Sequence, residues 1–352
     1  MGSFSVPIDN QREHNMSKQP LLVADIGGTK SLIALAERAG DHFRIHKKRY
    51  YENKKFNSGY DVLSEYIQSI GKVKNLHATL GIAGHIQKDS VYLTNRKWQF
   101  NKAQLEKDFD FISLNLVNDL EAMMKGVLFL NENDTIEIQK GIAREGGNIC
   151  VIAAGTGLGE AVAVYCKEIN DYHIIPSEVS QADFSAANEV ESELWNYTRK
   201  HKPGASIETL LSGSGLIKIY QYLIHKVELE DINLTQFLEM ENPAGEITKR
   251  ANSGEDEYCK KAVDIFISIY ANEARNFAFR MLPYGGIFIG GGIAPKIFGE
   301  KDSSGFLQRK EIFLRTFLRE SKMENFLENV PIYIINSEDT VLYGAASFAE
   351  SK

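Results

Sequence analysis

Two glycine-rich turns in this sequence have the composition of phosphate-binding segments. In DIGGTK the residues concerned are Gly27, Gly28, Thr29 and Lys30, and in AAGTGLGE they are Gly155, Thr156 and Gly157. Glycine has no Cβ, so backbone N–H groups can approach phosphate oxygens closely, and a threonine hydroxyl adds a donor. A third segment, formed by Gly290, Gly291 and Gly292, would let a nucleotide lie close to the backbone. One such turn could equally be a hairpin without a ligand, but together they predict a polyphosphate site.

The residues around the first turn exclude the best-known phosphate loops. DIGGTK has neither the GxxxxGK[ST] spacing of a P-loop nor the GxGxxG spacing of a dinucleotide-binding fold. An apolar, β-permissive run follows it, so we expect the chain to reverse into a hairpin with the glycines at its tip. Asp25, beside that tip, could hold a hydrated Mg²⁺ ion.

A carboxylate suited to proton transfer lies in LVNDLEA, residues 116–122. Transfer of a phosphoryl group to a hydroxyl requires a carboxylate within hydrogen-bond reach to accept the proton. Asp119 is expected between a strand and a helix, where its side chain would project into a cleft between two lobes. The alternative is that Asp119 serves only as the N-cap of the helix that follows.

The elements that must position these residues form two similar series. In the first we expect strands at 21–24, 31–37, 78–83 and 115–117, and a helix over 120–130 that begins just after Asp119. A polar stretch, 131–148, separates this series from a second strand-turn-strand unit at 149–165, which indicates a duplicated architecture. A long amphipathic helix over 260–282 then leads to a strand and a helix start within 285–298.

The composition excludes several classes of protein. The 352 residues are 43% hydrophobic and 25% charged, as in an ordinary globular protein of about two domains, and the net charge of −7 argues against nucleic-acid binding. No segment reaches the roughly 18 apolar residues of a membrane span, and the first 19 residues lack the apolar core of a signal peptide. We therefore expect a cytoplasmic protein without membrane partners, in which Cys150, Cys166 and Cys259 are buried free thiols.

The segments and their order resemble the bacterial glucokinase family, part of the superfamily of sugar kinases, actin and heat-shock ATPases. DIGGTK and AAGTGLGE are similar to that family's two phosphate segments, and LVNDLEA is similar to its catalytic segment. TNRKWQF (94–100), LLSGSGL (210–216) and GGIFIGGGIAPKIF (285–298) are similar to its TN-x-x-W connection, its LSGPGL segment and its nucleotide-side segment. The resemblance extends from residue 21 to about residue 346.

The resemblance also implies a set of sugar-binding residues. In that family an Asn-Asp pair, two glutamates and a histidine hold the sugar. Asn118 and Asp119 match the pair, and Asp119 would be the general base for the 6-hydroxyl. PSEVSQADF (176–184) is similar to the family's PGEGGHVDF, so Glu178 takes the place of the first glutamate, and Glu208 takes that of the second. Asn95, in the TN-x-x-W connection, is assigned to the substrate as well.

One position departs from the family pattern. The family's histidine falls on Gln181, and the glycines before it fall on Val179 and Ser180. A glutamine amide can still bind a hydroxyl but cannot become cationic. The sequence pattern therefore predicts the type of reaction better than it predicts the identity of the sugar. The related repressor/kinase family carries a zinc-binding cysteine cluster that this sequence lacks, which excludes that subgroup.

The resemblance implies an α/β fold of the two-lobed actin-like ATPase (ribonuclease H-like) type, with a ligand cleft between the lobes. We expect a flexible arm at 1–20, a small domain at 21–130 plus 340–352, and a large domain at 131–339. The implied activity is transfer of the ATP gamma-phosphoryl group to the 6-hydroxyl of glucose, with Mg²⁺, in a cytoplasmic homodimer. The alternatives are a kinase of another hexose or an idle sugar or nucleotide sensor, and ADP or polyphosphate could replace ATP as donor.

Overall fold

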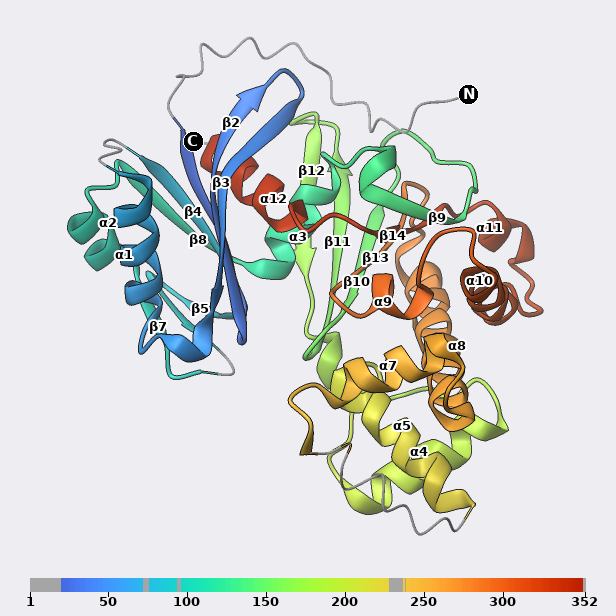
Figure 1. Cartoon of the computed structure of the whole chain (residues 1–352). Coiled ribbons are helices and arrows are strands. Elements are labelled where there is room, and N and C mark those ends of the chain that lie inside the picture. Colours follow the sequence, from blue (N-terminus) through green and yellow to red (C-terminus); the bar gives the residue numbers. More distant parts are fainter. Residues whose placement is uncertain (1–19, 72–75, 94–95, 228–236, 238, 351–352) are drawn as a thin grey trace. The chain divides into compact units, whose positions relative to one another are not determined.

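The chain divides into two compact units, which Figure 1 shows in sequence colours. The structure is a computed structural model that describes residues 20–71, 76–93, 96–227, 237 and 239–350. The first unit comprises residues up to 134, residues 165–176 and residues from 337 onward, and the second comprises residues 135–164 and 177–336. The predicted arm at 1–20 lies, apart from Pro20, outside the described residues.

The first unit is built on a five-stranded sheet with the order β3-β2-β1-β4-β8. Its strands are β1 (Leu21–Ile26), β2 (Lys30–Ala39), β3 (His42–Glu52), β4 (His77–Ile82) and β8 (Ser113–Asn118). The predicted hairpin is confirmed, because β1 and β2 pair antiparallel on either side of the glycine turn, while β1, β4 and β8 run parallel. A small antiparallel sheet joins β5 (Gly84–Gln87), β6 (Ser90–Leu93) and β7 (Gln99–Asn101).

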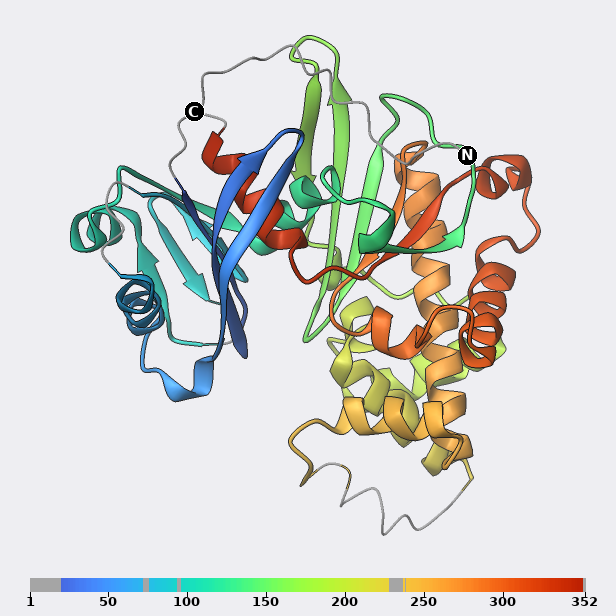
Figure 2. The same ribbon diagram turned by 45° about the horizontal axis from the view of Figure 1, so that its top comes forward.

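Helices cover both faces of the first sheet (Figures 1 and 2). On one face lie α1 (Gly59–Ile70) and α2 (Lys102–Phe109), which bury apolar side chains such as Tyr66 and Leu105 against the strands. On the other face lie α3 (Asp119–Val127) and α12 (Thr340–Glu350), where Ala122 and Val341 pack on Val117. The sheet is therefore apolar on both faces, as its parallel strands require.

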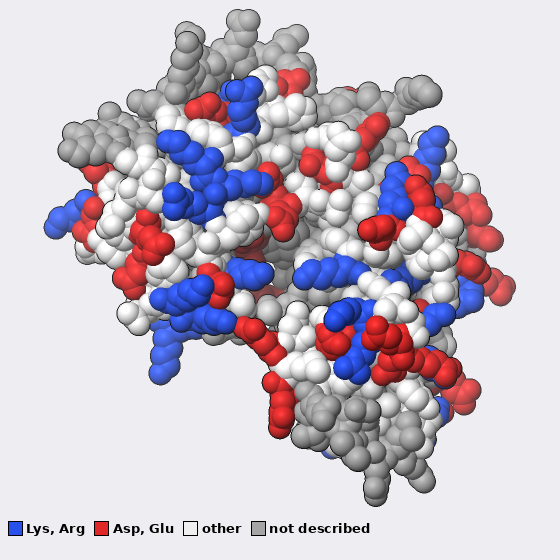
Figure 3. Space-filling view, viewed as in Figure 1, with Lys and Arg blue, Asp and Glu red and all other residues white. Residues whose placement is uncertain are grey.

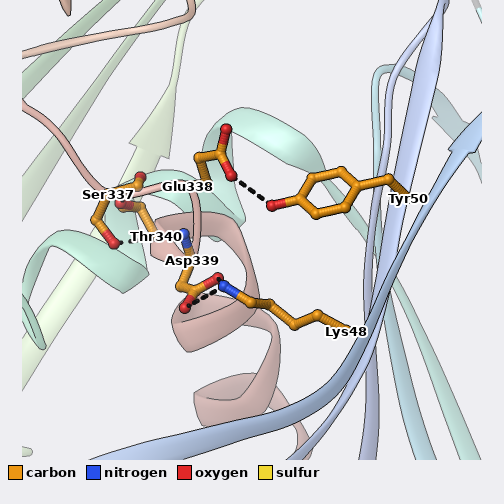
Figure 4. A network of polar contacts seen from close by, with 6 residues as sticks. All are labelled: Lys48, Tyr50, Ser337, Glu338, Asp339 and Thr340. Atoms are coloured by element: carbon orange, nitrogen blue, oxygen red, sulfur yellow. Dashed lines mark hydrogen bonds and ion pairs between the residues drawn. The ribbon is translucent and has the colours of Figure 1, made fainter.

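Polar contacts from β3 fix the segment that enters α12 (Figure 4). The Lys48 ammonium lies 2.8 Å from Asp339 Oδ1, and the Tyr50 hydroxyl donates to Glu338. The Thr340 hydroxyl donates to the Ser337 carbonyl at 2.9 Å, which closes the turn before the helix. These contacts help to hold the C-terminal helix in the first unit, where it packs mainly against α3, β1 and β4.

The start of α3 differs from the prediction. The predicted N-cap, Asp119, is the first residue of the helix, and Asn118 is the cap. The Asn118 Oδ1 atom accepts the Leu120 amide at 2.9 Å and the Glu121 amide at 3.4 Å. The prediction was wrong because asparagine and aspartate cap equally well and stand side by side here. Asp119 is thereby released from the capping role.

The second unit repeats the arrangement of the first around a mixed sheet. Its strands β9 (Thr135–Gln139), β10 (Ile149–Ala154), β11 (Leu158–Cys166), β13 (Gly286–Gly290) and β14 (Ile332–Ile335) follow the order β11-β10-β13-β14-β9. β10 and β11 form an antiparallel hairpin, and β10, β13 and β14 are parallel, as in β2-β1-β4-β8. The expected duplication of strand-turn-strand units is confirmed. β9, however, lies in the polar stretch 131–148 and was not predicted.

Helices of the second unit surround one long central helix, α8 (Glu257–Met281), whose buried face includes Phe266 and Tyr270. In both ribbon views α4 (Glu189–His201), α5 (Gly213–Lys226) and α7 (Pro243–Ser253) gather at one end of this unit. Its described residues also form the helices α9 (Ala294–Phe298), α10 (Ser304–Phe317) and α11 (Glu324–Glu328).

The two units differ from the expected domains at their boundaries, by residues 131–134 and 337–339, and in one longer segment. Residues 165–176, assigned to the large domain from the sequence, belong to the first unit by their contacts. The segment includes β12 (Asp171–Pro176), which contacts α3. The Lys125 ammonium of α3, which is largely buried, lies 2.9 Å from Asp171 Oδ2. This ion pair links the segment to the first unit. No pattern in the sequence predicts the ion pair.

The surface charges, the apolar character of the helices and the cysteines can be compared with the expectations from composition. Acidic and basic side chains are interspersed on the face shown in Figure 3. None of the helices within the described residues combines the length and apolar character needed to cross a membrane. All three cysteines are free; Cys150 and Cys259 are buried as predicted, but Cys166, near the end of β11, is partly exposed.

The close contact between α3 and α12 generates a stability prediction. A Cβ atom at Gly344 would lie 1.8 Å from the Ala122 carbonyl oxygen, so a side chain there would force the helices apart. We expect Gly344→Ala to lower the free energy of unfolding by about 1–3 kcal/mol, although alanine is the better helix former by about 1 kcal/mol. Chemical denaturation measures the change. The matched control is Gly305→Ala in α10, where a Cβ atom meets nothing closer than 4.0 Å and stability should stay or rise.

Candidate active site

The first unit brings its predicted polar residues to one edge of the sheet. Asp25 lies near the end of β1 and pairs in register with Gly81, which pairs with Val117. Asn118 ends β8, and Asp119 begins α3. The strands are parallel, so their carboxyl ends meet at one edge, which is where ligands bind in open α/β sheets.

Asp25 and Asp119 repel each other in partly buried surroundings. Burial, and then the charge of Asp119, raise the pKa of Asp25 to about 7. Burial also raises the pKa of Asp119, although the Leu120 amide, 3.0 Å from Oδ1, opposes that shift by stabilising the charged form. Among the described residues none donates a hydrogen bond to the Asp25 carboxylate. The pair therefore attracts a proton or a cation.

These carboxylates fit a magnesium ion that is held mainly by water and phosphate. Mg²⁺ usually binds proteins through one or two carboxylates, with water and substrate phosphates as its other ligands. Asp25 supplies hard oxygen atoms that no described cation neutralises. Within the described part of the chain, His, Cys, Asp and Glu form no group of three that could make an all-protein cage.

The first glycine turn presents unoccupied amides. The Gly27 amide donates to the Lys30 carbonyl at 3.0 Å and closes the turn. The amides of Gly28 and Thr29 donate to no other described residue. The carbonyls, by contrast, are held from outside: Gly27 by the Asn53 side chain at 2.8 Å and Gly28 by Arg96 Nε at 2.7 Å. This arrangement suits an anion.

The second unit holds its glycine turn in a similar way. Gly155 donates to the Gly157 carbonyl at 2.8 Å, and its own carbonyl accepts the Gly213 amide at the start of α5, also at 2.8 Å. Gly291, with φ +81°, lies so close to this hairpin that a Cβ atom would be 2.2 Å from the Ala154 oxygen. The second turn and the triple glycine at the end of β13 are therefore neighbours, as the polyphosphate prediction requires.

The predicted sugar residues of the second unit lie on or next to two short 3₁₀ turns, Val179–Gln181, which Glu178 precedes, and Ile207–Thr209. The Ile207 amide donates to the Ala182 carbonyl at 2.8 Å and joins the two turns. Glu178 and Gln181 are exposed, and the Gln181 amide donates to the Ser180 hydroxyl.

Glu208 makes a contact that the sequence did not predict. Its Oε2 atom accepts the Leu158 amide at 3.0 Å. The carboxylate therefore lies against the glycine turn that leads into β11, and a predicted sugar residue touches a predicted phosphate segment.

Each unit thus assembles its own share of the predicted residues. Asp25, Asn118 and Asp119 share a sheet edge with the first turn, and Glu208 joins the second turn. Asn95 lies outside the described residues.

Sequence reasoning missed Asn53 and Arg96. Arg96 stands next to Asn95 in TNRKWQF, which was a usable signal, whereas nothing in the polar run around Asn53 distinguishes it.

The raised pKa of Asp25 generates a prediction about pH. The folded protein keeps the proton up to about pH 7, whereas the unfolded chain releases it near 3.8. Stability should therefore fall as pH rises between these values, and the loss should be complete above them. We expect Asp25→Asn to remove this loss, so the variant gains stability relative to the parent protein between pH 5 and pH 8. Chemical denaturation of the ligand-free proteins measures it, with exposed Asp41→Asn as control; parallel profiles for Asp25→Asn and the parent would contradict the assignment.

Comparison with known proteins shows the family of the chain. The family model described as Glucokinase matches residues 22–352. The glucokinase of Nostoc punctiforme is 33% identical over 342 residues, which cover 93% of this chain and 97% of that protein. The crystal structure of a glucokinase from an Antarctic psychrotroph is 28% identical, with a TM-score of 0.80, and covers 96% of this chain and 100% of that chain. The chain has the two-lobed actin-like ATPase fold, as expected, and it belongs to the glucokinase family.

Proposed function

We propose that the protein transfers the terminal phosphoryl group of ATP to the 6-hydroxyl of glucose. The observation that carries the proposal is the position of Asp119. It follows β8, begins α3 and is free of the capping role, and its pKa is raised by burial. A carboxylate with a raised pKa is a better general base, because its affinity for the proton is closer to that of the reacting hydroxyl.

Asp119 acts on the hydroxyl through one of its two oxygens. The Leu120 amide holds Oδ1, which leaves Oδ2 to accept the proton as the hydroxyl oxygen attacks the terminal phosphorus atom. The bond from that phosphorus atom to the bridging oxygen breaks in the same transfer, and ADP leaves. The proton then rests on Asp119 until it passes to solvent. A bound Mg²⁺ ion, held through Asp25, would neutralise charge on the terminal phosphates.

The remaining residues bind and orient. The phosphates are bound by the two glycine turns. The first turn contributes the amides of Gly28 and Thr29, the Thr29 hydroxyl and the Lys30 ammonium, and the second contributes the Thr156 hydroxyl. Gly290–Gly292 approach the nucleotide. The sugar hydroxyls are bound by Asn95, Asn118, Glu178, Gln181 and Glu208. Carboxylates suit a polyol because each oxygen accepts hydroxyl hydrogen bonds. The homodimer and the cytoplasmic location stay predictions.

A coupled assay of ADP release tests the function directly. With ATP and Mg²⁺ we expect turnover on glucose above that on mannose, fructose and galactose. Asp119→Asn should lower kcat by about 10²–10⁴ and leave glucose binding largely intact, because asparagine keeps the size of the side chain but not its basicity. Calorimetry measures the binding.

The assay also separates the alternatives. Turnover on another hexose but not on glucose would overturn the choice of substrate, and glucose binding without turnover by the parent protein would identify a sensor. Exposed Asp41→Asn, which alters a turn between β2 and β3, is the matched control and should keep full activity. If Asp119→Asn kept it too, Asp119 would not be the base.

Because Glu208 contacts the second glycine turn, we expect a substitution in that phosphate segment to change the affinity of the protein for the sugar. A Cβ atom at Gly157 would lie 2.7 Å from Glu208 Oε2. Gly157→Ala should displace the carboxylate and raise the KM for glucose by about 10- to 100-fold, the cost of one charged hydrogen bond. Gly155→Ala is the matched control for this parameter, because its Cβ atom meets nothing within 4 Å. If only the KM for ATP rose, Glu208 would not be a sugar ligand.

A further inference from the structure

The carbonyl groups of the first glycine turn are all bound from outside the turn. Gly27 accepts the Asn53 side-chain amide at 2.8 Å, Gly28 accepts Arg96 Nε at 2.7 Å, and Thr29 accepts the Asn53 backbone amide at 2.9 Å. Two residues that lie far from the turn in the sequence thus hold three successive peptide groups.

Fixing a carbonyl also fixes the amide of the same peptide group. In a trans peptide the C=O and N–H bonds point to opposite sides of one rigid plane. Asn53 therefore directs the Gly28 N–H away from itself, and Arg96 directs the Thr29 N–H away from itself. Neither amide donates to another described residue, so both remain available to an anion.

Both holding side chains are themselves held. Asn53 is fully buried, and its Oδ1 accepts the Ser31 hydroxyl at 2.8 Å, so its amide cannot rotate without losing a buried hydrogen bond. The Arg96 guanidinium lies 5.2 Å from the ring centre of Trp98, a ring buried in the core of the first unit. A planar guanidinium can stack and donate at once, which an ammonium cannot.

We propose that Asn53 and Arg96 are positioning residues that aim the Gly28 and Thr29 amides at the terminal phosphate of the nucleotide. The proposal rests on the proposed function. Arg96 acts through the Thr29 amide and Asn53 through the Gly28 amide, so the two contributions are separable. The bond from a cationic donor also polarises the peptide group between Gly28 and Thr29 and makes that amide a stronger donor.

Kinetics give the first test. Arg96→Met should lower kcat/KM for ATP by about 10- to 100-fold, because a small misplacement of a phosphate ligand costs up to about 10²-fold. The KM for glucose should stay within about two-fold, since no sugar contact is lost. Arg96→Lys, which keeps a donor for the Gly28 carbonyl, should recover part of the loss. Lys97→Met, which removes the adjacent exposed cation, is the matched control and should match the parent protein.

Amide NMR gives the decisive test, because it reports on each amide separately. If Arg96 and Asn53 had only a structural role, their substitution would not abolish the ATP response of one amide and leave that of the other. In the parent protein the Gly28 and Thr29 amide resonances should both shift on titration with ATP. In Arg96→Met the Thr29 response should be lost and the Gly28 response kept, and in Asn53→Asp the reverse should hold. If Arg96→Met does not fold, Arg96→Lys is titrated in its place and should show a reduced Thr29 response.

The outcomes separate this proposal from the proposed function. Responses of both amides without phosphorylation of glucose would support the positioning role and overturn the activity. Phosphorylation of glucose with no response of either amide would overturn the positioning role alone. An unchanged Thr29 response in Arg96→Met, or equal kinetic losses in Arg96→Met and Lys97→Met, would also overturn it.

Discussion

Hydrogen bonding between a hairpin and a parallel strand determines where the polar residues of each unit lie. β1 pairs antiparallel with β2 and parallel with β4, and β10 pairs in the same way with β11 and β13. A hairpin turns at the carboxyl end of its first strand, and the parallel strands end at that same edge. The glycine turn and the residues that follow the parallel strands are therefore neighbours. A register slip of one residue would move Asp25 to the other face of the sheet and dissolve the arrangement.

Much of this arrangement could be predicted because its signals are local. A glycine turn between two apolar runs indicates a hairpin, and Asp119 stands where an apolar run changes to helical spacing. The Asn53 and Arg96 contacts could not be predicted, since they join residues 26 and 68 positions from their partners in the turn. β9 was not predicted because its short TIEIQ pattern lies among polar residues. The strand is defined by its pairing with β14. The choice of Asn118 as helix cap depended on geometry alone.

The two units treat buried carboxylates differently, and the difference distinguishes a ligand site from a structural one. In the second unit Glu160 and Glu273 are almost fully buried side by side, and burial raises the pKa of both. Arg280 Nη2 lies 3.0 Å from Glu273 Oε1, so Glu273 has a cation beside it inside the protein. The buried Glu160 Oε1 atom has no hydrogen-bond partner among the described residues. For Asp25 and Asp119 no described cation plays the part of Arg280, so charge must come from a ligand.

The return of the C-terminal helix to the first unit has a consequence for protein synthesis. α12 packs against α3, and the Asn115 side chain donates to the Phe348 carbonyl across 233 positions of sequence. At about 5–20 residues per second, a ribosome needs roughly 10–50 s to make the chain between these partners. During that interval the second unit can complete itself while one face of the first sheet still lacks its covering helix. The part of the protein made first is thus the part finished last, and the nascent chain exposes an apolar surface that chaperones are suited to protect.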